Sequence, residues 1–150
     1  MEGINFRAVF NVDNKLFFDA LLVRKKVFVD EQNVDITEEI DDFDDKAYHV
    51  VGYLLNEAVC CARIYSNDNK WYWGRIAVLG KYRGKKIGNK LMDFLKDFSK
   101  KELSLHEVYI HAQNYAVNFY EKNGFKKISD VYMDTNIEHV DMKLLIENED

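Results

Sequence analysis

Residues 80–90 combine glycines and cations in a way that suits a bound anion. The segment holds Gly80, Gly84 and Gly88 together with five lysines and arginines, and it contains no carboxylate. Glycine lets the backbone approach a ligand closely, and the first amides of a helix have no intrahelical partners. Because helical periodicity begins at Ile87, these amides and the helix dipole would form a cradle for an anion. A tight turn with solvated lysines is the simpler alternative.

The two common nucleotide-binding patterns are missing from this sequence. It contains no G-x-x-x-x-G-K-[ST], and no G-x-G-x-x-G follows a predicted strand. ATP or NAD is therefore a less expected ligand than another small anion.

The apolar pattern along the chain predicts a single α+β domain over residues 1–150. Alternation predicts strands over 4–12, 47–55, 58–66, 70–79, 107–112, 125–134 and 138–146. Helical spacing predicts a helix that begins after Asn14 and carries Phe17, Leu21, Arg24 and Phe28, a helix from Ile87 with Leu91, Phe94, Leu95 and Phe98, and a short helix that ends at Gly124. A further short helix and an exposed loop are expected within 30–45. The order β-α-α-β-β-β-α-β-α-β-β is typical of a mostly antiparallel, mixed sheet of about seven strands with helices on both faces.

Composition narrows the class of protein. Apolar residues make up 47% of the chain and aromatic residues 14%, which indicates a packed globular domain. The net charge of −5 argues against a general nucleic-acid binder. No apolar run approaches the roughly 20 residues that a membrane span needs, and the first residues do not resemble an export signal, so a cytoplasmic protein is expected. Cys60 and Cys61 are neighbours that would point to opposite faces of a strand, so neither a disulfide nor a metal site is expected.

The loop Arg83-Gly84-Lys85-Lys86-Ile87-Gly88 resembles the R/Q-x-x-G-x-G/A pyrophosphate loop of the GNAT superfamily of N-acetyltransferases, which binds acetyl-coenzyme A. The resemblance spans nearly the whole chain and is closest to the ElaA-like branch. It includes Arg24-Lys25-Lys26-Val27-Phe28-Val29-Asp30-Glu31-Gln32, Cys61-Ala62-Arg63, Gly74-Arg75-Ile76-Ala77-Val78, Ala112-Gln113, Phe119-Tyr120-Glu121-Lys122-Asn123-Gly124-Phe125 and His139-Val140-Asp141-Met142. Lys86 stands where the first glycine of the pattern is usual, and a positive φ there would cost of order 1 kcal/mol. The branch's G-I-P-H turn reads Asn136-Ile137-Glu138-His139 in this chain.

The resemblance implies roles for particular residues. Acetyl-CoA would contact Ile76, Ala77, Val78, Arg83, Gly84, Lys85, Lys86, Ile87, Gly88, Asn114 and Tyr120, and Tyr120 would be the general acid. The acceptor would contact Arg24, Phe28, Glu31, Gln113 and His139.

Two assignments stay open at the level of sequence. The general base is Glu31, His111 or His139, since each could take a proton directly or through water, although a lone histidine on a strand is more often structural. Arg24, on an apolar helix stripe, is expected to form an ion pair inward with Glu31 or with a carboxylate of the following loop.

The predicted function is direct transfer of an acetyl group from acetyl-CoA to a primary amine of a small molecule. The acidic segment 30–45 would border the acceptor entrance, where Asp41, Asp42 and Asp44 would attract cationic amines. A non-catalytic acyl-CoA sensor and a phosphate- or nucleotide-binding module unrelated to acetylation are the alternatives. Neither nucleic acid nor membrane is expected as a partner, and the chain would be a monomer or a homodimer.

Overall fold

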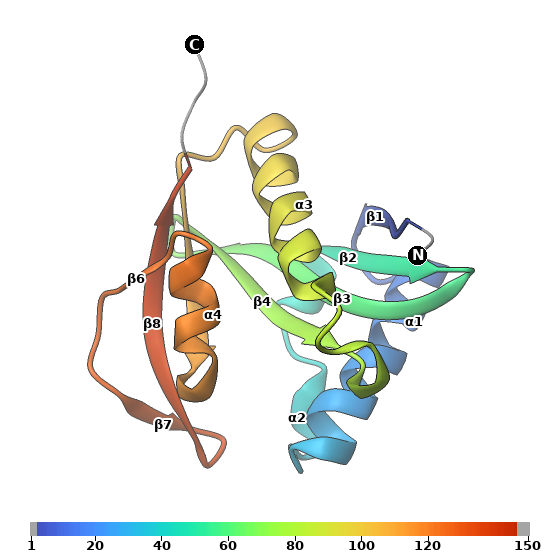
Figure 1. Ribbon diagram of the computed structural model, residues 1–150, viewed down its shortest axis with the longest axis horizontal. Coiled ribbons are helices and arrows are strands. Elements are labelled where there is room, and N and C mark those ends of the chain that lie inside the picture. Colours follow the sequence, from blue (N-terminus) through green and yellow to red (C-terminus); the bar gives the residue numbers. More distant parts are fainter. Residues whose placement is uncertain (1–2, 147–150) are drawn as a thin grey trace.

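The computed structural model describes residues 3–146, which form one sheet of eight strands in the order β1-β2-β3-β4-β5-β8-β6, with β7 paired to β8 (Figure 1). The strands are β1 Asn5–Phe10, β2 Ala47–Leu54, β3 Glu57–Asn67, β4 Lys70–Val78, β5 Glu107–Gln113, β6 Lys126–Lys127, β7 Tyr132–Asp134 and β8 Ile137–Leu145. All neighbouring strands are antiparallel except β4 and β5, which are parallel. The predicted α+β class and mixed sheet are confirmed. The strand expected over 125–134 is instead two short strands, β6 and β7.

The helices cover both faces of the sheet (Figure 1). They are α1 Lys15–Arg24, the π-helix η1 Lys25–Glu31, α2 Ile36–Glu39, α3 Ile87–Lys101 and α4 Val117–Lys122, with short 3-10 turns η2 Asp44–Lys46, η3 Gly80–Tyr82 and η4 Asn114–Ala116. Leu91 of α3 and Tyr120 of α4 belong to one buried cluster, whereas Ala20 of α1 belongs to another. Because strand side chains alternate, Cys60 lies in the first cluster and Cys61 in the second. No helix within the described part of the chain is long and apolar enough to cross a bilayer.

The first helix begins where the sequence predicts but changes type before it ends. The Asn14 side chain accepts a hydrogen bond from the Phe17 amide at 2.8 Å and caps α1. After Arg24 the chain continues as the seven-residue π-helix η1, so Phe28 does not extend the α-helical stripe. A π-helix carries more residues in each turn than an α-helix and is frequent at functional sites.

The sheet parts between β4 and β5. Their ladder contains only Tyr72 opposite Tyr109 and Trp73 opposite Ile110, while β4 runs on to Val78. A bulge at this point, where the β3–β4 register shifts and Arg75 has φ +49°, increases the local twist. Beyond Trp73, no strand among residues 3–146 pairs with the edge of β4 that faces β5. The free edge therefore lies at the centre of the molecule.

Candidate functional site

The glycine-rich loop leads into α3 with unpaired amides. Gly84 has φ +79° and Lys86 has φ +64°. Lys86, which stands where the family pattern has a glycine, therefore has a left-handed backbone conformation. Lys86 caps α3 without a side-chain hydrogen bond, and the first amide paired to the helix is that of Lys90, which bonds to the Lys86 carbonyl at 3.2 Å. The three preceding amides, those of Ile87, Gly88 and Asn89, have no intrahelical partner. The predicted anion cradle therefore has its donors in place.

A cavity of about 450 Å³ extends from this loop to the free edge of β4. It is lined by nine of the residues that are expected to contact the cofactor: Ile76, Ala77, Val78, Arg83, Gly84, Lys86, Ile87, Gly88 and Tyr120. We call it the donor cavity.

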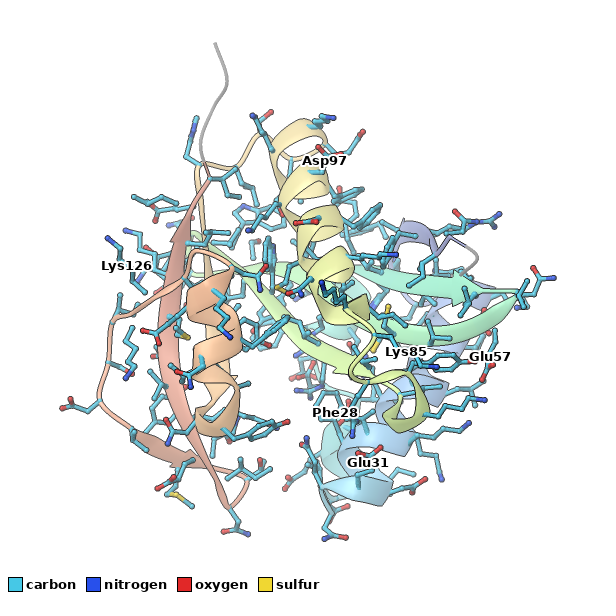
Figure 2. All side chains as sticks on the ribbon, viewed as in Figure 1. Phe28, Glu31, Glu57, Lys85, Asp97 and Lys126 are labelled. Atoms are coloured by element: carbon cyan, nitrogen blue, oxygen red, sulfur yellow. The ribbon has the colours of Figure 1, made fainter. Side chains whose placement is uncertain are left out.

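Two expected cofactor residues lie outside the donor cavity. The Lys85 ammonium lies 5.7 Å from the centre of the Tyr82 ring, on the loop before α3 (Figure 2). The Asn114 side chain donates to the Glu138 carboxylate at 3.4 Å.

A smaller cavity of about 170 Å³ lies on the other side of the parted strands. We call it the acceptor cavity. Its walls include Phe28, Glu38, Arg75, His111, Asp134 and His139. It shares Ile76, Gln113, Tyr115, Ala116 and Tyr120 with the donor cavity. The two cavities therefore meet where β4 and β5 separate.

Tyr120 lies at the junction of the cavities. Its side chain is only 8% exposed and packs edge-on against the rings of Phe119 and Phe125, at centroid distances of 5.3 and 5.7 Å. Burial raises the pKa of its phenol well above the usual value. The phenol forms no hydrogen bond with any described residue, so it is a protonated donor available to a ligand.

Two histidines line the acceptor cavity from adjacent strands. His111 Nδ1 lies 2.6 Å from Asp141 Oδ1, and the Tyr132 hydroxyl donates to the same oxygen. His139 Nδ1 lies 2.8 Å from the Ile137 carbonyl oxygen. Sequence reasoning missed Asp141 and Tyr132. The signal for Asp141 was its spacing, because a residue two positions beyond His139 on a strand shares its face.

Arg24 and Glu31 do not lie where the acceptor was expected. The Arg24 side chain is 1% exposed, and its guanidinium is bound by Glu39 and Asp44 at distances that include 2.7 and 2.9 Å. The predicted inward ion pair with a loop carboxylate is therefore confirmed. The pairing with Glu31 and a substrate contact by Arg24 are wrong, because Nε of Arg24 donates to Glu39 and both of its terminal nitrogens donate to Asp44. Glu31 instead pairs with Arg83 at 2.8 Å and does not line the acceptor cavity.

Much of the acidic segment is neutralised within the protein. Arg63 binds Asp41 at 2.7 Å and Asp44 at 2.9 Å, and Arg75 binds Glu39 at 2.9 Å. Asp44 is 1% exposed, so the expectation that it attracts amines through solvent is wrong. The roles of Arg63 and Arg75 were also missed, although an arginine within an apolar strand signals a buried ion pair.

Comparisons with known proteins place this geometry in a family. A family model described as an acetyltransferase (GNAT) domain matches residues 18–146. The chain is 32% identical to an uncharacterised N-acetyltransferase, YjcF, of Bacillus subtilis, over 91% of this chain and 97% of that protein. It is also 32% identical to protein ElaA of Escherichia coli, over 81% of this chain and 82% of that protein.

Solved structures agree with the sequence comparisons. The crystal structure of Escherichia coli ElaA matches with a TM-score of 0.84 at 29% identity and covers 95% of this chain and 99% of that chain. An acyl-CoA N-acyltransferase from Pseudomonas aeruginosa shares the fold, with a TM-score of 0.85 at 22% identity over 95% of this chain and 99% of that chain. The chain therefore belongs to the GNAT superfamily of N-acetyltransferases and is similar to its ElaA-like branch.

Proposed function

We propose that this protein transfers an acetyl group from acetyl-CoA directly to a primary amine of a small molecule. The observation that carries the proposal is the meeting of two cavities at Tyr120. A donor in one cavity and an acceptor in the other would bring a thioester and an amine together beside a protonated phenol. Holding two reactants in this way removes much of the entropic cost of a bimolecular reaction.

The donor cavity suits the parts of acetyl-CoA. The unpaired amides at the start of α3, together with Arg83 and Lys86, would hold the diphosphate. The free edge of β4 over Ile76 and Val78 would bond to the amide groups of the pantetheine arm, as an added strand does. A backbone amide near the bulge would stabilise the oxyanion that forms on the thioester carbonyl.

The burial of both cysteines supports direct transfer of the acetyl group. Cys60 and Cys61 are completely buried, and burial raises the pKa of the Cys60 thiol to about 12. A thiol of this kind is protonated at neutral pH and is a poor nucleophile. The acetyl group is therefore expected to pass to the amine without a cysteine-bound intermediate.

Tyr120 would protonate the departing thiolate. Its high pKa keeps the phenol protonated at neutral pH, and positioned acids of this kind contribute roughly 10²–10⁴-fold to the rate. We expect Tyr120→Phe to lower kcat by about 10²-fold or more and to change acetyl-CoA affinity by less than about twofold, because the ring remains and only the hydroxyl is lost. Calorimetry and thiol release with a panel of amines give the two quantities.

The same measurements separate the alternatives. A wild-type protein that binds acetyl-CoA but releases no thiol with any amine would be a sensor. Displacement of bound CoA by ATP at similar concentrations would indicate a nucleotide-binding module. Phe119→Leu, in the same helix and lining the donor cavity, is the control for loss of packing beside Tyr120.

A further inference from the structure

His139 lies beside the junction of the two cavities. In the ladder between β5 and β8 it is directly opposite Gln113, and Gln113 lines both cavities. His111 is opposite Asp141, two residues farther back along β5, which corresponds to about 7 Å along the strand. Of the two histidines, His139 is therefore the nearer to the place where donor and acceptor meet.

The hydrogen bond of His139 determines which nitrogen can take a proton. The Ile137 carbonyl oxygen can only accept, so Nδ1 of His139 carries the hydrogen in the bond of 2.8 Å. Nε2 then holds the free lone pair, and it has no partner among residues 3–146. His139 is 7% exposed, and its ring stacks against that of Tyr132 at a centroid distance of 6.0 Å, which limits its rotation.

The other two candidates for the base are placed less well. Glu31 is engaged by Arg83 and lies outside the acceptor cavity. The His111 side chain is 46% exposed at the cavity wall, where Asp141 holds its Nδ1 and the Tyr72 ring stacks on it at 5.1 Å. His111 can contact an acceptor, but it is more distant from the junction.

We propose that Nε2 of His139 is the general base that takes a proton from the acceptor amine. This assignment rests on the proposed function. His139 removes one proton from the ammonium group, and the nitrogen lone pair then forms a bond to the thioester carbon. The C–S bond breaks as the thiolate takes a proton from Tyr120, and the second amine proton restores the phenol. One proton is released for each acetyl group transferred, from His139 to solvent.

Other ionisable groups face the same space. Those lining the acceptor cavity are Glu38, Glu39, Arg75, His111, Tyr115, Tyr120 and Asp134, and Tyr132 lies against the His139 ring. Histidine is the residue type that most often serves as a general base, and two histidines line this cavity. A matched pair of histidine variants therefore distinguishes their roles.

The test compares His139→Asn with His111→Asn. Asparagine places an amide where Nδ1 lay, so the bond to the Ile137 carbonyl is kept while Nε2 is removed. For the best amine of the panel, we expect His139→Asn to lower kcat by about 10²–10³-fold and to remove the fall of kcat/KM at acid pH. Acetyl-CoA affinity, measured by calorimetry, should change by less than about twofold. His111→Asn should keep the acid limb and lose less than about tenfold in kcat/KM.

A wild-type acid limb that persists in His139→Asn, with kcat within about threefold of wild type, would overturn the assignment and leave the proposed function intact. Binding of acetyl-CoA without turnover by the wild type would instead overturn the proposed function, and the base with it. Long-range ¹⁵N–¹H spectra of the free protein give a test without turnover. They should show hydrogen on Nδ1 of His139 at neutral pH, and a ring with hydrogen on Nε2 alone would contradict the proposal.

Discussion

Lys86 holds a left-handed backbone conformation at the start of α3, where the glycine pattern of the family is broken. Its φ of +64° is costly for a residue with a Cβ atom, whereas the neighbouring Lys85 has no positive φ. Both side chains are exposed. Glycine substitutions at Lys86 and at Lys85 therefore distinguish the effect of backbone strain from the effect of losing a surface lysine.

We expect Lys86→Gly to leave the free energy of unfolding unchanged or to raise it by up to about 1 kcal/mol, because relief of strain offsets the greater freedom of glycine in the unfolded chain. Lys85→Gly should lower it by about 0.5–1 kcal/mol, because no strain is relieved there. Urea unfolding of both variants measures the difference. Equal losses in the two variants would show that the conformation at Lys86 carries no strain.

At the scale of elements, the π-helix η1 connects the loop to the far side of the parted sheet. Glu31 binds Arg83 of the loop at 2.8 Å. Gln32, the residue directly after η1, exchanges two amide hydrogen bonds of 3.2 and 2.7 Å with Gln113 of β5. Figure 2 shows Phe28 and Glu31 on this same segment. One element therefore contributes Phe28 to the acceptor cavity and holds the arginine that would bind the donor.

Glu31 competes with a diphosphate for Arg83. We expect Glu31→Gln to tighten acetyl-CoA binding by about two- to fivefold, which corresponds to the free energy of an exposed ion pair. The gain in affinity should be larger at low salt, because salt screens exposed charges. Its effect on kcat should be less than about twofold, because Glu31 lies away from the acceptor cavity. Calorimetry at two salt concentrations and steady-state rates provide the data.

The control for this variant is Asp30→Asn. Asp30 lies on the same π-helix and pairs with Lys25 at 3.4 Å rather than with the loop. It should change donor affinity much less than Glu31→Gln. A fall in kcat of more than about tenfold in Glu31→Gln would return Glu31 to the role of general base.

Local patterns in the sequence predict most elements of this fold but not how they meet. The cap at Asn14 and the buried stripe of α3 depend on residues three or four apart, so they are visible in the sequence. The partners of Arg24 lie 15 and 20 residues away, and no periodicity identifies them. The spacing of apolar residues predicts an α-helix at Phe28, because it does not reveal the wider turn of a π-helix. The tautomer of His139 depends on a carbonyl contact that only the folded turn creates.

Over the whole molecule, a set of buried and half-buried charges joins the helical layer on one face to the sheet. Its members are Arg24, Arg63, Arg75, Glu39, Asp41 and Asp44, three cations and three anions. They come from α1, β3, β4 and the acidic segment. Because Glu39 and Arg75 also line the acceptor cavity, this set holds the wall of the site. Each member pairs with two members of opposite charge, so loss of one would leave two partners with a single counter-charge each.

The same set makes stability depend on pH. Burial alone would raise the pKa of Asp44, but hydrogen bonds and charges from Arg24 and Arg63 lower it to about 2. Burial lowers the pKa of His49, whose Nε2 contacts the Asp44 carbonyl oxygen at 2.8 Å. In both cases the unfolded chain binds the proton more readily than the folded one, so stability is lost as the pH falls.

We expect the free energy of unfolding to be nearly constant between about pH 7 and pH 8, to decline as unfolded His49 takes its proton below about pH 6.5, and to decline further below about pH 4. Protonation of Asp44 alone should remove about 2 kcal/mol as the pH falls from about 4 to about 2. Urea unfolding at several pH values measures this profile. His49→Gln should remove the decline in the free energy of unfolding below about pH 6.5. His111→Gln, at an exposed histidine, should leave that decline in place. A free energy of unfolding that stays constant from pH 7 to pH 3 would contradict the lowered pKa values of Asp44 and His49 in the folded protein.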